Sequence, residues 1–292
     1  MANSPRTASI NHSNPASNRQ PIGVFDSGLG GLRVLDRLMH TLPEERFVYL
    51  GDTLHMPYGE KTHPQVIDYV SGCLNWLFEA HQVKMVVVAC NTAASVAPHL
   101  FEQYPDVPFV DPVTPICRWL KDEGKYHKVG VMATLATVAS NRYQMLLEQL
   151  QAPVHLSQVG CGNLATLIEE GEGDTYACKV LLRKYLQPLQ EAQSEAIILG
   201  CTHYPYVMDQ IAALAPEADI LDPAVFMALE AKRLLAETQL ASPNKTGRSV
   251  AEVDYFVTAE PDRFYETSLR MPFQALAMKQ PKVVSVPSPT LS

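Results

Sequence analysis

The sequence predicts an α/β protein built from two pseudo-symmetric, doubly wound parallel-sheet domains with the active site between them. Short apolar strands alternate with amphipathic helices along the 292 residues, which is the pattern of parallel sheets covered by helices on both faces. Residues 129–134 repeat the pattern of residues 22–27 at an offset of 107. Two cysteines in matching contexts, Cys90 and Cys201, each end an apolar strand. These repeats predict two equivalent halves.

The first half begins with an apolar strand at 22–25, which leads into the glycine-rich turn 26–31. A turn of this kind exposes backbone N–H groups to an anion. The dinucleotide-binding fingerprint nevertheless fits poorly, because its third glycine would fall at Arg33. The other elements expected in this half are a helix at 32–42, a strand at 47–50, a loop through 57–61, an amphipathic helix around Cys73, the strand ending at Cys90, and a helix after it.

Three prolines within residues 108–115 indicate a crossover between domains, and the strand–helix pattern restarts beyond them. Residues 220–223 close the second half. In between we expect a strand at 129–133, a helix at 143–150, a short strand before Gly160, a helix at 180–189 and the strand ending at Cys201. After residue 223 we expect a helix to about residue 237, a loop at 241–247, a strand at 253–258, a helix from Pro261 and a last strand at 283–286.

Composition and charge narrow the class of protein. The chain is 47% hydrophobic and 18% charged, and no apolar run approaches the roughly 20 residues that span a membrane. A net charge of −8 without any basic cluster argues against a nucleic-acid surface. Six cysteines without a secretory signal suggest a reducing, cytoplasmic setting. Residues 1–20 are expected to be a disordered polar tail, with a transit peptide as the alternative, and residues 287–292 a second disordered tail.

The two strand-end cysteines carry the strongest chemical signal. The carboxyl ends of parallel strands are where open α/β sheets bind ligands, so Cys90 and Cys201 are expected on opposite walls of one cleft. Inversion at a carbon needs one base to remove a proton and another group to return one to the opposite face. A helix N-terminus or a neighbouring histidinium lowers the pKa of a thiol from about 8.5, and His203 lies close to Cys201 in sequence. Asp26, at the end of its strand, can relay a proton there.

Other interpretations of these residues stay open at this point. Both thiols can be inert core residues, as is expected of Cys73, Cys117 and Cys178 on their helices. A zinc site from Cys90, Cys201 and His203 lacks a usual ligand spacing, and no CxxC is present. Nucleophilic thiol catalysis with His203 as base explains one cysteine and leaves the other without a role.

Four short segments of the chain combine these polar and thiol residues with glycines and prolines. They are Asp26-Ser27-Gly28; Gly51-Asp52-Thr53 with Pro57-Tyr58-Gly59; Ala89-Cys90-Asn91-Thr92; and Gly200-Cys201-Thr202-His203-Tyr204-Pro205. In sequence, order and spacing they resemble the signature segments of glutamate racemases, within the cofactor-independent aspartate/glutamate racemase superfamily. The similarity covers roughly residues 21–224, with a weaker echo at 256–269.

The resemblance implies a first domain of residues 21–114 completed by 225–286, a second domain of 115–224, and the active site between them. It implies interconversion of L- and D-glutamate, which supplies D-glutamate for peptidoglycan, with no cofactor and no metal. The expected partner is the small-molecule substrate glutamate, and we expect a homodimer that binds neither nucleic acid nor membrane.

The resemblance also assigns residues. Cys90 and Cys201 would be the two bases, assisted by Asp26 and His203 respectively. Asp52 and Glu169 align with acids that help the proton transfers. The residues implied in holding the amino acid are Asp26, Ser27, Pro57, Tyr58, Gly59, Asn91, Thr92, Thr134, Thr137, Thr202 and His203.

The chain departs from the family pattern at three places. Cys161-Gly162 stands where Cys-Pro is usual, His55 where an arginine is common, and Leu221-Asp222-Pro223 where Asp-Ser is usual. None of these positions is a base, but they leave room for altered regulation or a relaxed substrate pocket. The alternatives are therefore a racemase of aspartate or another amino acid, and a non-catalytic amino-acid-binding protein on the same fold.

Overall fold

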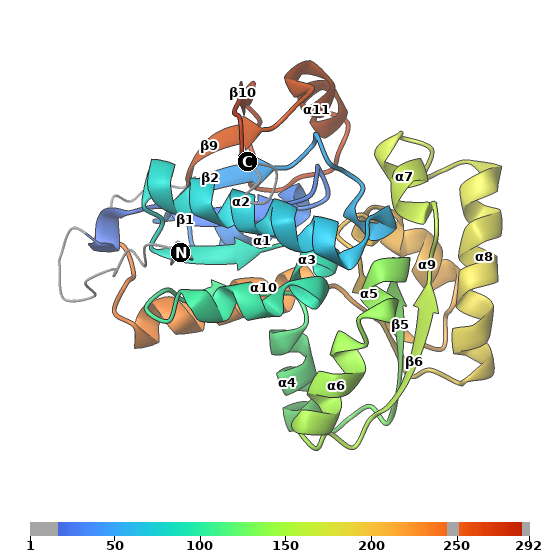
Figure 1. The fold of residues 1–292 in the computed structure, drawn as a ribbon. Coiled ribbons are helices and arrows are strands. Elements are labelled where there is room, and N and C mark those ends of the chain that lie inside the picture. Colours follow the sequence, from blue (N-terminus) through green and yellow to red (C-terminus); the bar gives the residue numbers. More distant parts are fainter. Residues whose placement is uncertain (1–16, 244–250, 288–292) are drawn as a thin grey trace.

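The computed structural model describes residues 17–243 and 251–287 and contains two parallel sheets flanked by helices (Figure 1). The predicted α/β class is confirmed. The first sheet has the strand order β10-β9-β2-β1-β3-β4 and the second β6-β5-β7-β8, and every pairing is parallel. The strands are β1 Ile22–Asp26, β2 Arg46–Gly51, β3 Met85–Val88, β4 Phe109–Val110, β5 Lys128–Ala133, β6 His155–Gly160, β7 Ala196–Gly200, β8 Asp219–Leu221, β9 Glu252–Val257 and β10 Lys282–Val283.

Helices connect these strands and cover both faces of each sheet. The α-helices are α1 Leu32–Thr41, α2 His63–His81, α3 Asn91–Val96, α4 Thr114–Glu123, α5 Leu135–Ala139, α6 Arg142–Gln149, α7 Leu164–Glu169, α8 Tyr176–Glu191, α9 Met208–Leu214, α10 Pro223–Glu237 and α11 Pro261–Ser268. Four short 3-10 helices are η1 Ser17–Arg19, η2 Tyr58–Glu60, η3 Pro98–Gln103 and η4 Tyr204–Val207. No helix within these described ranges combines the length and apolarity needed to cross a membrane.

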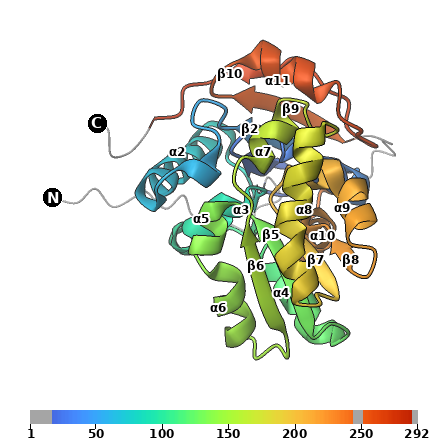
Figure 2. The ribbon, with the colours of Figure 1, turned by 90° about the vertical axis from the view of Figure 1, so that its right-hand side faces the viewer.

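The two sheets share the same core arrangement. β1 lies between β2 and β3, and β5 lies between β6 and β7, so the two strands that lead to Cys90 and Cys201 hold equivalent places. The first sheet is extended beyond β2 by β9 and β10 from the C-terminal segment, which together with α11 forms the upper edge of the molecule in Figure 2. The repeat in the sequence thus corresponds to a repeat in strand order.

Alternating side chains of each strand pack on opposite layers. On β1, Val24 belongs to the cluster under α1 and α10, whereas Phe25 belongs to the cluster under α2 and α3. On β7, Leu199 packs with α7, α8 and α9, and Ile198 packs with α4 and α6. Burial on both faces explains why these strands read as continuous apolar runs.

Two strands differ from the sequence-based expectation. The proline-rich crossover contains a two-residue strand, β4, which pairs with β3. The last strand covers Lys282–Val283 and not 283–286, because an edge strand extends only as far as its partner β9 offers hydrogen bonds. Residues 1–16 and 288–292 of the expected tails, and 244–247 of the expected loop, lie outside the described residues.

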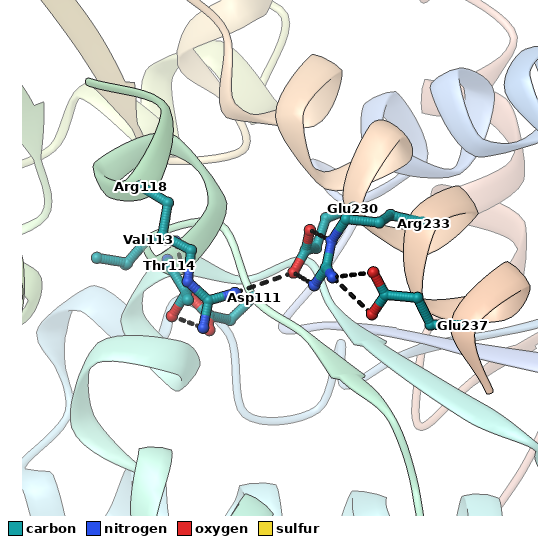
Figure 3. A network of polar contacts seen from close by, with 7 residues as sticks. All are labelled: Asp111, Val113, Thr114, Arg118, Glu230, Arg233 and Glu237. Atoms are coloured by element: carbon teal, nitrogen blue, oxygen red, sulfur yellow. Dashed lines mark hydrogen bonds and ion pairs between the residues drawn. The ribbon is translucent and has the colours of Figure 1, made fainter. Parts of the chain in front are cut away.

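The two chain crossings between the sheets are held by a polar network (Figure 3). Asp111, after β4, accepts hydrogen bonds from the backbone N–H groups of Val113 and Thr114, each at 2.8 Å, at the start of α4. On the next turns Arg118 pairs with Glu230 of α10 at 3.1 Å. Arg233 also binds Glu230, and Glu237 binds Arg233, along the same helix. These contacts fix α4 against α10 where the chain passes from one sheet to the other.

A buried ion pair anchors the start of β3. Lys84 is fully buried and donates to Glu45 at 2.6 Å and to the carbonyl of Asn18 at 2.8 Å. Glu45 in turn accepts from the backbone N–H of Ser242 at 2.8 Å. Burial lowers the pKa of Lys84, and the carboxylate of Glu45 opposes that shift. The pair therefore joins the described start of the chain to the end of α10.

Replacement of Lys84 by Met is expected to lower the free energy of unfolding by roughly 3–5 kcal/mol, because it leaves the buried carboxylate of Glu45 without its cationic partner. Urea titration followed by circular dichroism measures the change. The matched control is Lys125→Met, which breaks the exposed pair with Asp219 and is expected to have a small effect. Equal losses in the two variants would contradict the prediction.

Candidate active site

The carboxyl ends of the central strands of both sheets meet at one place. Asp26 ends β1, Cys90 follows β3 and Cys201 follows β7. The two halves touch here directly, since the hydroxyl of Thr202 donates to Asp26 Oδ1 at 3.4 Å. Both cysteine side chains are nearly enclosed, with exposed fractions of 4% for Cys90 and 6% for Cys201. The expected cleft is therefore closed around its thiols in this structure.

Cys90 caps the N-terminus of α3. Its sulfur accepts from the backbone N–H of Ala93 at 3.5 Å and donates to the hydroxyl of Ser27 at 3.6 Å. Burial raises the pKa of the Cys90 thiol to about 12, and the nearby carboxyl of Asp26 adds to the rise. The bonds from Ala93 and with Ser27 oppose this shift. In this closed state the Cys90 sulfur carries its proton at neutral pH.

Cys201 faces a histidine–carboxylate pair. His203 Nδ1 lies 3.8 Å from Cys201 Sγ, and His203 Nε2 lies 2.7 Å from Glu169 Oε2 at the end of α7. Burial opposes a charge on the imidazole, but hydrogen bonds to Cys201 and Glu169 outweigh it and raise the pKa of His203 well above its ordinary value. A protonated His203 donates from both ring nitrogens, one toward the sulfur and one toward Glu169.

The glycine-rich turn closes on Asp26. This carboxylate is fully buried and accepts from the backbone N–H of Gly28 at 3.0 Å. Burial raises the pKa of Asp26, while His203 and the N–H groups of Gly28 and Gly31 hold it down. The backbone N–H groups that the sequence predicted to be available to an anion therefore bind the carboxylate of Asp26. The hydroxyl of Tyr49 on β2 also holds the turn, because it donates to the carbonyl of Gly28 at 2.7 Å.

Three threonines join the halves on the other side of the thiols. Thr92 of α3 lies 2.9 Å from Thr134 and 3.4 Å from Thr137, oxygen to oxygen, and the latter two lie 2.9 Å apart. Gly59 belongs to the same contact, since a Cβ there would lie 2.8 Å from the Cβ of Thr134. The structure therefore brings the loop before α2 and the start of α5 together.

Tyr58 and Asp52 lie beside this contact. Tyr58 is 1% exposed and donates to Asp52 Oδ2 at 2.6 Å. Pro57 has an extended conformation and directly precedes η2, and Tyr58 and Gly59 are the first two residues of this short helix. Every residue that the sequence implicated except Asp52 and Glu169 thus lies on the turn 26–31, on η2 or directly before it, at the beginning of α3 or α5, or in the turn between β7 and η4. Asp52 and Glu169 contact Tyr58 and His203, respectively.

Asn91 has a partner that the sequence did not reveal. Tyr143 of α6, in the second half, is fully buried and donates to Asn91 Oδ1 at 2.8 Å. An amide whose oxygen is occupied in this way presents its NH₂ group elsewhere. No local pattern marks Tyr143, because the hydroxyl acts across 52 residues of sequence.

Tyr143→Phe is expected to raise the KM for the substrate roughly three- to tenfold with little change in kcat, the effect of losing one hydrogen bond that orients a binding amide. Steady-state kinetics measures it. The control is Tyr104→Phe, which removes a hydroxyl bound to the amide oxygen of Asn75 at 2.9 Å, away from the thiols. A KM equal to that of the control would contradict an orienting role for Tyr143.

The remaining cysteines are buried and free. Cys73, Cys117 and Cys178 lie on α2, α4 and α8, within the apolar clusters. Cys161 lies near Cys201, and burial raises its pKa to about 12. Its sulfur donates to the carbonyl of Val159, as expected of a side chain in a backbone turn. Across the described residues, no group of three or more His, Cys, Asp and Glu side chains is arranged to hold a metal ion.

Comparison with known proteins gives a consistent result. Residues 23–231 match the Asp/Glu/Hydantoin racemase family. The chain is 36% identical to the glutamate racemase of Trichodesmium erythraeum over 252 residues, which are 86% of this chain and 90% of that protein. Among solved structures, the glutamate racemase of Francisella tularensis in complex with D-glutamate has a TM-score of 0.84 at 30% identity, covering 92% of this chain and 98% of that one. The Thermus thermophilus glutamate racemase in complex with β-chloro-D-alanine has a TM-score of 0.79 at 35% identity, covering 93% and 98%.

Two parallel sheets that meet at a pair of enclosed thiols, together with these matches, define an isomerase of the racemase class. The chain belongs to the Asp/Glu/Hydantoin racemase family. Within that family the relatives that it resembles are glutamate racemases, so the resemblance predicted from the four signature segments is confirmed.

Proposed function

We propose that this protein interconverts L- and D-glutamate without a cofactor, using Cys90 and Cys201 as its two acid/base groups. One observation carries the proposal. Each thiol ends the equivalent strand of its own sheet, and each has its own polar partners, Ser27 and Asp26 for Cys90 and His203 for Cys201. Two such groups on opposite walls can reach both faces of one carbon.

The groups around the two thiols differ, and we assign the starting state of the site from them. Burial raises the pKa of Cys90 to about 12, so its sulfur begins as the proton donor. The raised pKa of His203 makes the imidazole a cation, and its Nδ1 lies 3.8 Å from the sulfur of Cys201. Glu169 balances the charge of the imidazolium from its other side.

The proton balance of the reaction then closes within the site. The thiolate of Cys201 removes the proton from Cα of one enantiomer and leaves a carbanion, and the thiol of Cys90 gives its proton to the opposite face. The product is the other enantiomer, with Cys90 now the thiolate and Cys201 the thiol, which is the starting state for the reverse reaction. Asp26 and His203 assist their respective sulfurs.

The substrate is held by groups that line the closed cleft from both halves. Hydroxyls and amides suit an amino acid's carboxylates and ammonium. The binding residues in this proposal are Ser27, Pro57, Tyr58, Gly59, Asn91, Thr92, Thr134, Thr137 and Thr202, together with Asp26 and His203. Residues 21–114 with 225–286 and residues 115–224 act as two domains that separate to admit glutamate. We place the enzyme in the cytoplasm as a homodimer that supplies D-glutamate for peptidoglycan.

The test is racemisation of L-glutamate by the purified protein in deuterated water without pyridoxal phosphate. Loss of optical rotation together with exchange of the α-hydrogen, followed by proton NMR, is expected. Binding of glutamate without exchange would instead identify a binding protein, and faster turnover of aspartate in a substrate panel would reassign the substrate. Activity that a chelator removes would contradict the metal-free mechanism.

A further inference from the structure

The loop that carries Tyr58 is tied to the C-terminal segment on its outer side. The hydroxyl of Thr53 donates to the carbonyl of Ala259 at 2.5 Å and accepts from its N–H at 2.9 Å. At the neighbouring position of each segment, the N–H of Leu54 donates to the hydroxyl of Thr258 at 2.9 Å. Strand β9 therefore ends against the loop that begins after β2, although the two segments lie 206 residues apart in sequence.

Asp52 is the centre of this contact. It is 1% exposed and accepts three side-chain donors. Thr258 donates to Oδ1 at 2.8 Å, Tyr58 donates to Oδ2 at 2.6 Å, and His55 Nδ1 lies 3.0 and 2.9 Å from the two oxygens. An ionised carboxylate only accepts, so His55 carries its hydrogen on Nδ1 here.

Each donor to Asp52 is itself held in place. His55 stacks on Tyr69 of α2, with ring centroids 3.9 Å apart and planes inclined by 12°. Tyr58 packs on Phe25 and Tyr69. The hydroxyl of Thr258 donates to Asp52 and accepts from the backbone N–H of Leu54. The group is a satisfied, buried hydrogen-bond network of the kind that rigidifies a site.

This arrangement leaves Asp52 unsuited to move a proton. Both oxygens are occupied by hydrogen-bond partners that come from the protein itself. The network holds the side chain of Tyr58, and its neighbour Gly59 lies against Thr134 of the opposite half. A shift of the loop by a fraction of an ångström would therefore change the shape of the cleft.

We propose that Asp52 and Thr258 are positioning residues that hold Tyr58, and with it Pro57 and Gly59, in the geometry that binds the substrate. This inference rests on the proposed function and assigns Asp52 a role other than the proton transfer suggested by the resemblance. It makes the end of β9 a part of the active site. Neither residue touches the reacting carbon, and both act through Tyr58.

The test begins with Thr258→Val, which removes one hydroxyl and keeps the shape of the side chain. The KM for L- and D-glutamate is expected to rise roughly three- to tenfold, with kcat within about twofold of wild type, as for the loss of one ordinary hydrogen bond. The primary isotope effect with α-deuterated substrate is expected to be unchanged for both enantiomers. Asp52→Asn is expected to act in the same direction with a larger rise in KM.

Two further variants serve as controls. Thr258→Ser keeps the hydroxyl and is expected to restore the wild-type KM. Thr238→Val makes the same change in a threonine that binds only the carbonyl of Leu234 within α10, and is expected to leave the KM unchanged. Thermal melting of each variant verifies that the chain is folded before its kinetics are compared.

The outcomes separate the possible roles. A wild-type KM in Thr258→Val would overturn the proposal. A fall in kcat with a larger isotope effect for one enantiomer in Asp52→Asn, at unchanged KM, would return Asp52 to proton transfer. If the wild-type protein binds D-glutamate but does not racemise it, the proposed function fails. The positioning role is then tested separately by the dissociation constant for D-glutamate, measured by calorimetry. A constant that Thr258→Val leaves unchanged overturns the role, and a constant that the substitution raises supports it.

Discussion

Cys90→Ala and Cys201→Ala are each expected to lower the rate of glutamate racemisation by roughly a thousandfold or more, because general acid–base catalysis at one face of the carbon is then lost. Each variant keeps one thiol and its partners. It can still exchange the α-hydrogen of one enantiomer with solvent, since a single base can remove and return a proton on the same face. The measurements are optical rotation for racemisation and proton NMR in deuterated water for exchange.

The matched control is Cys73→Ala, which removes a fully buried thiol from the apolar cluster of α2. This substitution is expected to lower the free energy of unfolding and to leave kcat near the wild-type value. A nucleophilic mechanism makes a different prediction, in which only one of Cys90 and Cys201 is essential. A normal rate of racemisation in either Cys90→Ala or Cys201→Ala would contradict the two-base mechanism.

The parallel sheets and the equivalence of the two halves were accessible from sequence because burial on both faces produces a clear apolar signal. The apolar runs that end near Asp26, Cys90 and Cys201 could be placed at the carboxyl ends of parallel strands without any coordinates. The repeat at 22–27 and 129–134 then indicated that β1 and β5 have equivalent places, which the matching strand orders bear out. Strand β4 was missed, because two residues among prolines carry no periodic signal.

The residues that orient the site could not be found in this way. Tyr143 acts on Asn91 across 52 residues, and Thr258 acts on Asp52 across 206. Each contributes one hydroxyl from an element whose own pattern is explained by packing. Long-range hydrogen bonds of single side chains leave no periodicity, so only the folded chain reveals them.

The glycine-rich turn shows how a correct local prediction can have another cause. The sequence indicated a backbone that offers N–H groups to an anion, and the N–H of Gly28 does bind a carboxylate, that of Asp26. Gly30 meets a different requirement. A Cβ at this position would collide with the hydroxyl of Thr202 and lie 2.9 Å from His203 Cε1 and Nδ1. The absence of a side chain there lets the two halves close.

Gly30→Ala is therefore expected to lower kcat/KM by about a hundredfold, the cost of displacing catalytic groups by about 1 Å. The added methyl group pushes the segment with Thr202 and His203 away from Asp26, so the halves close incompletely around the substrate. Steady-state kinetics in both directions measures the loss. The thermal melting temperature is expected to change little, since each half keeps its own core.

The control for this prediction is Gly162→Ala, in the turn after β6, where an added Cβ makes only ordinary contacts, the nearest at 3.8 Å from a side-chain carbon of Leu135. It is expected to keep kcat/KM close to wild type. If Gly30→Ala behaved like this control, the halves would not need to approach as closely during turnover as they do in this structure. A large fall in melting temperature would instead place the role of Gly30 in folding, because the damage would then extend beyond the contact between the turn and His203.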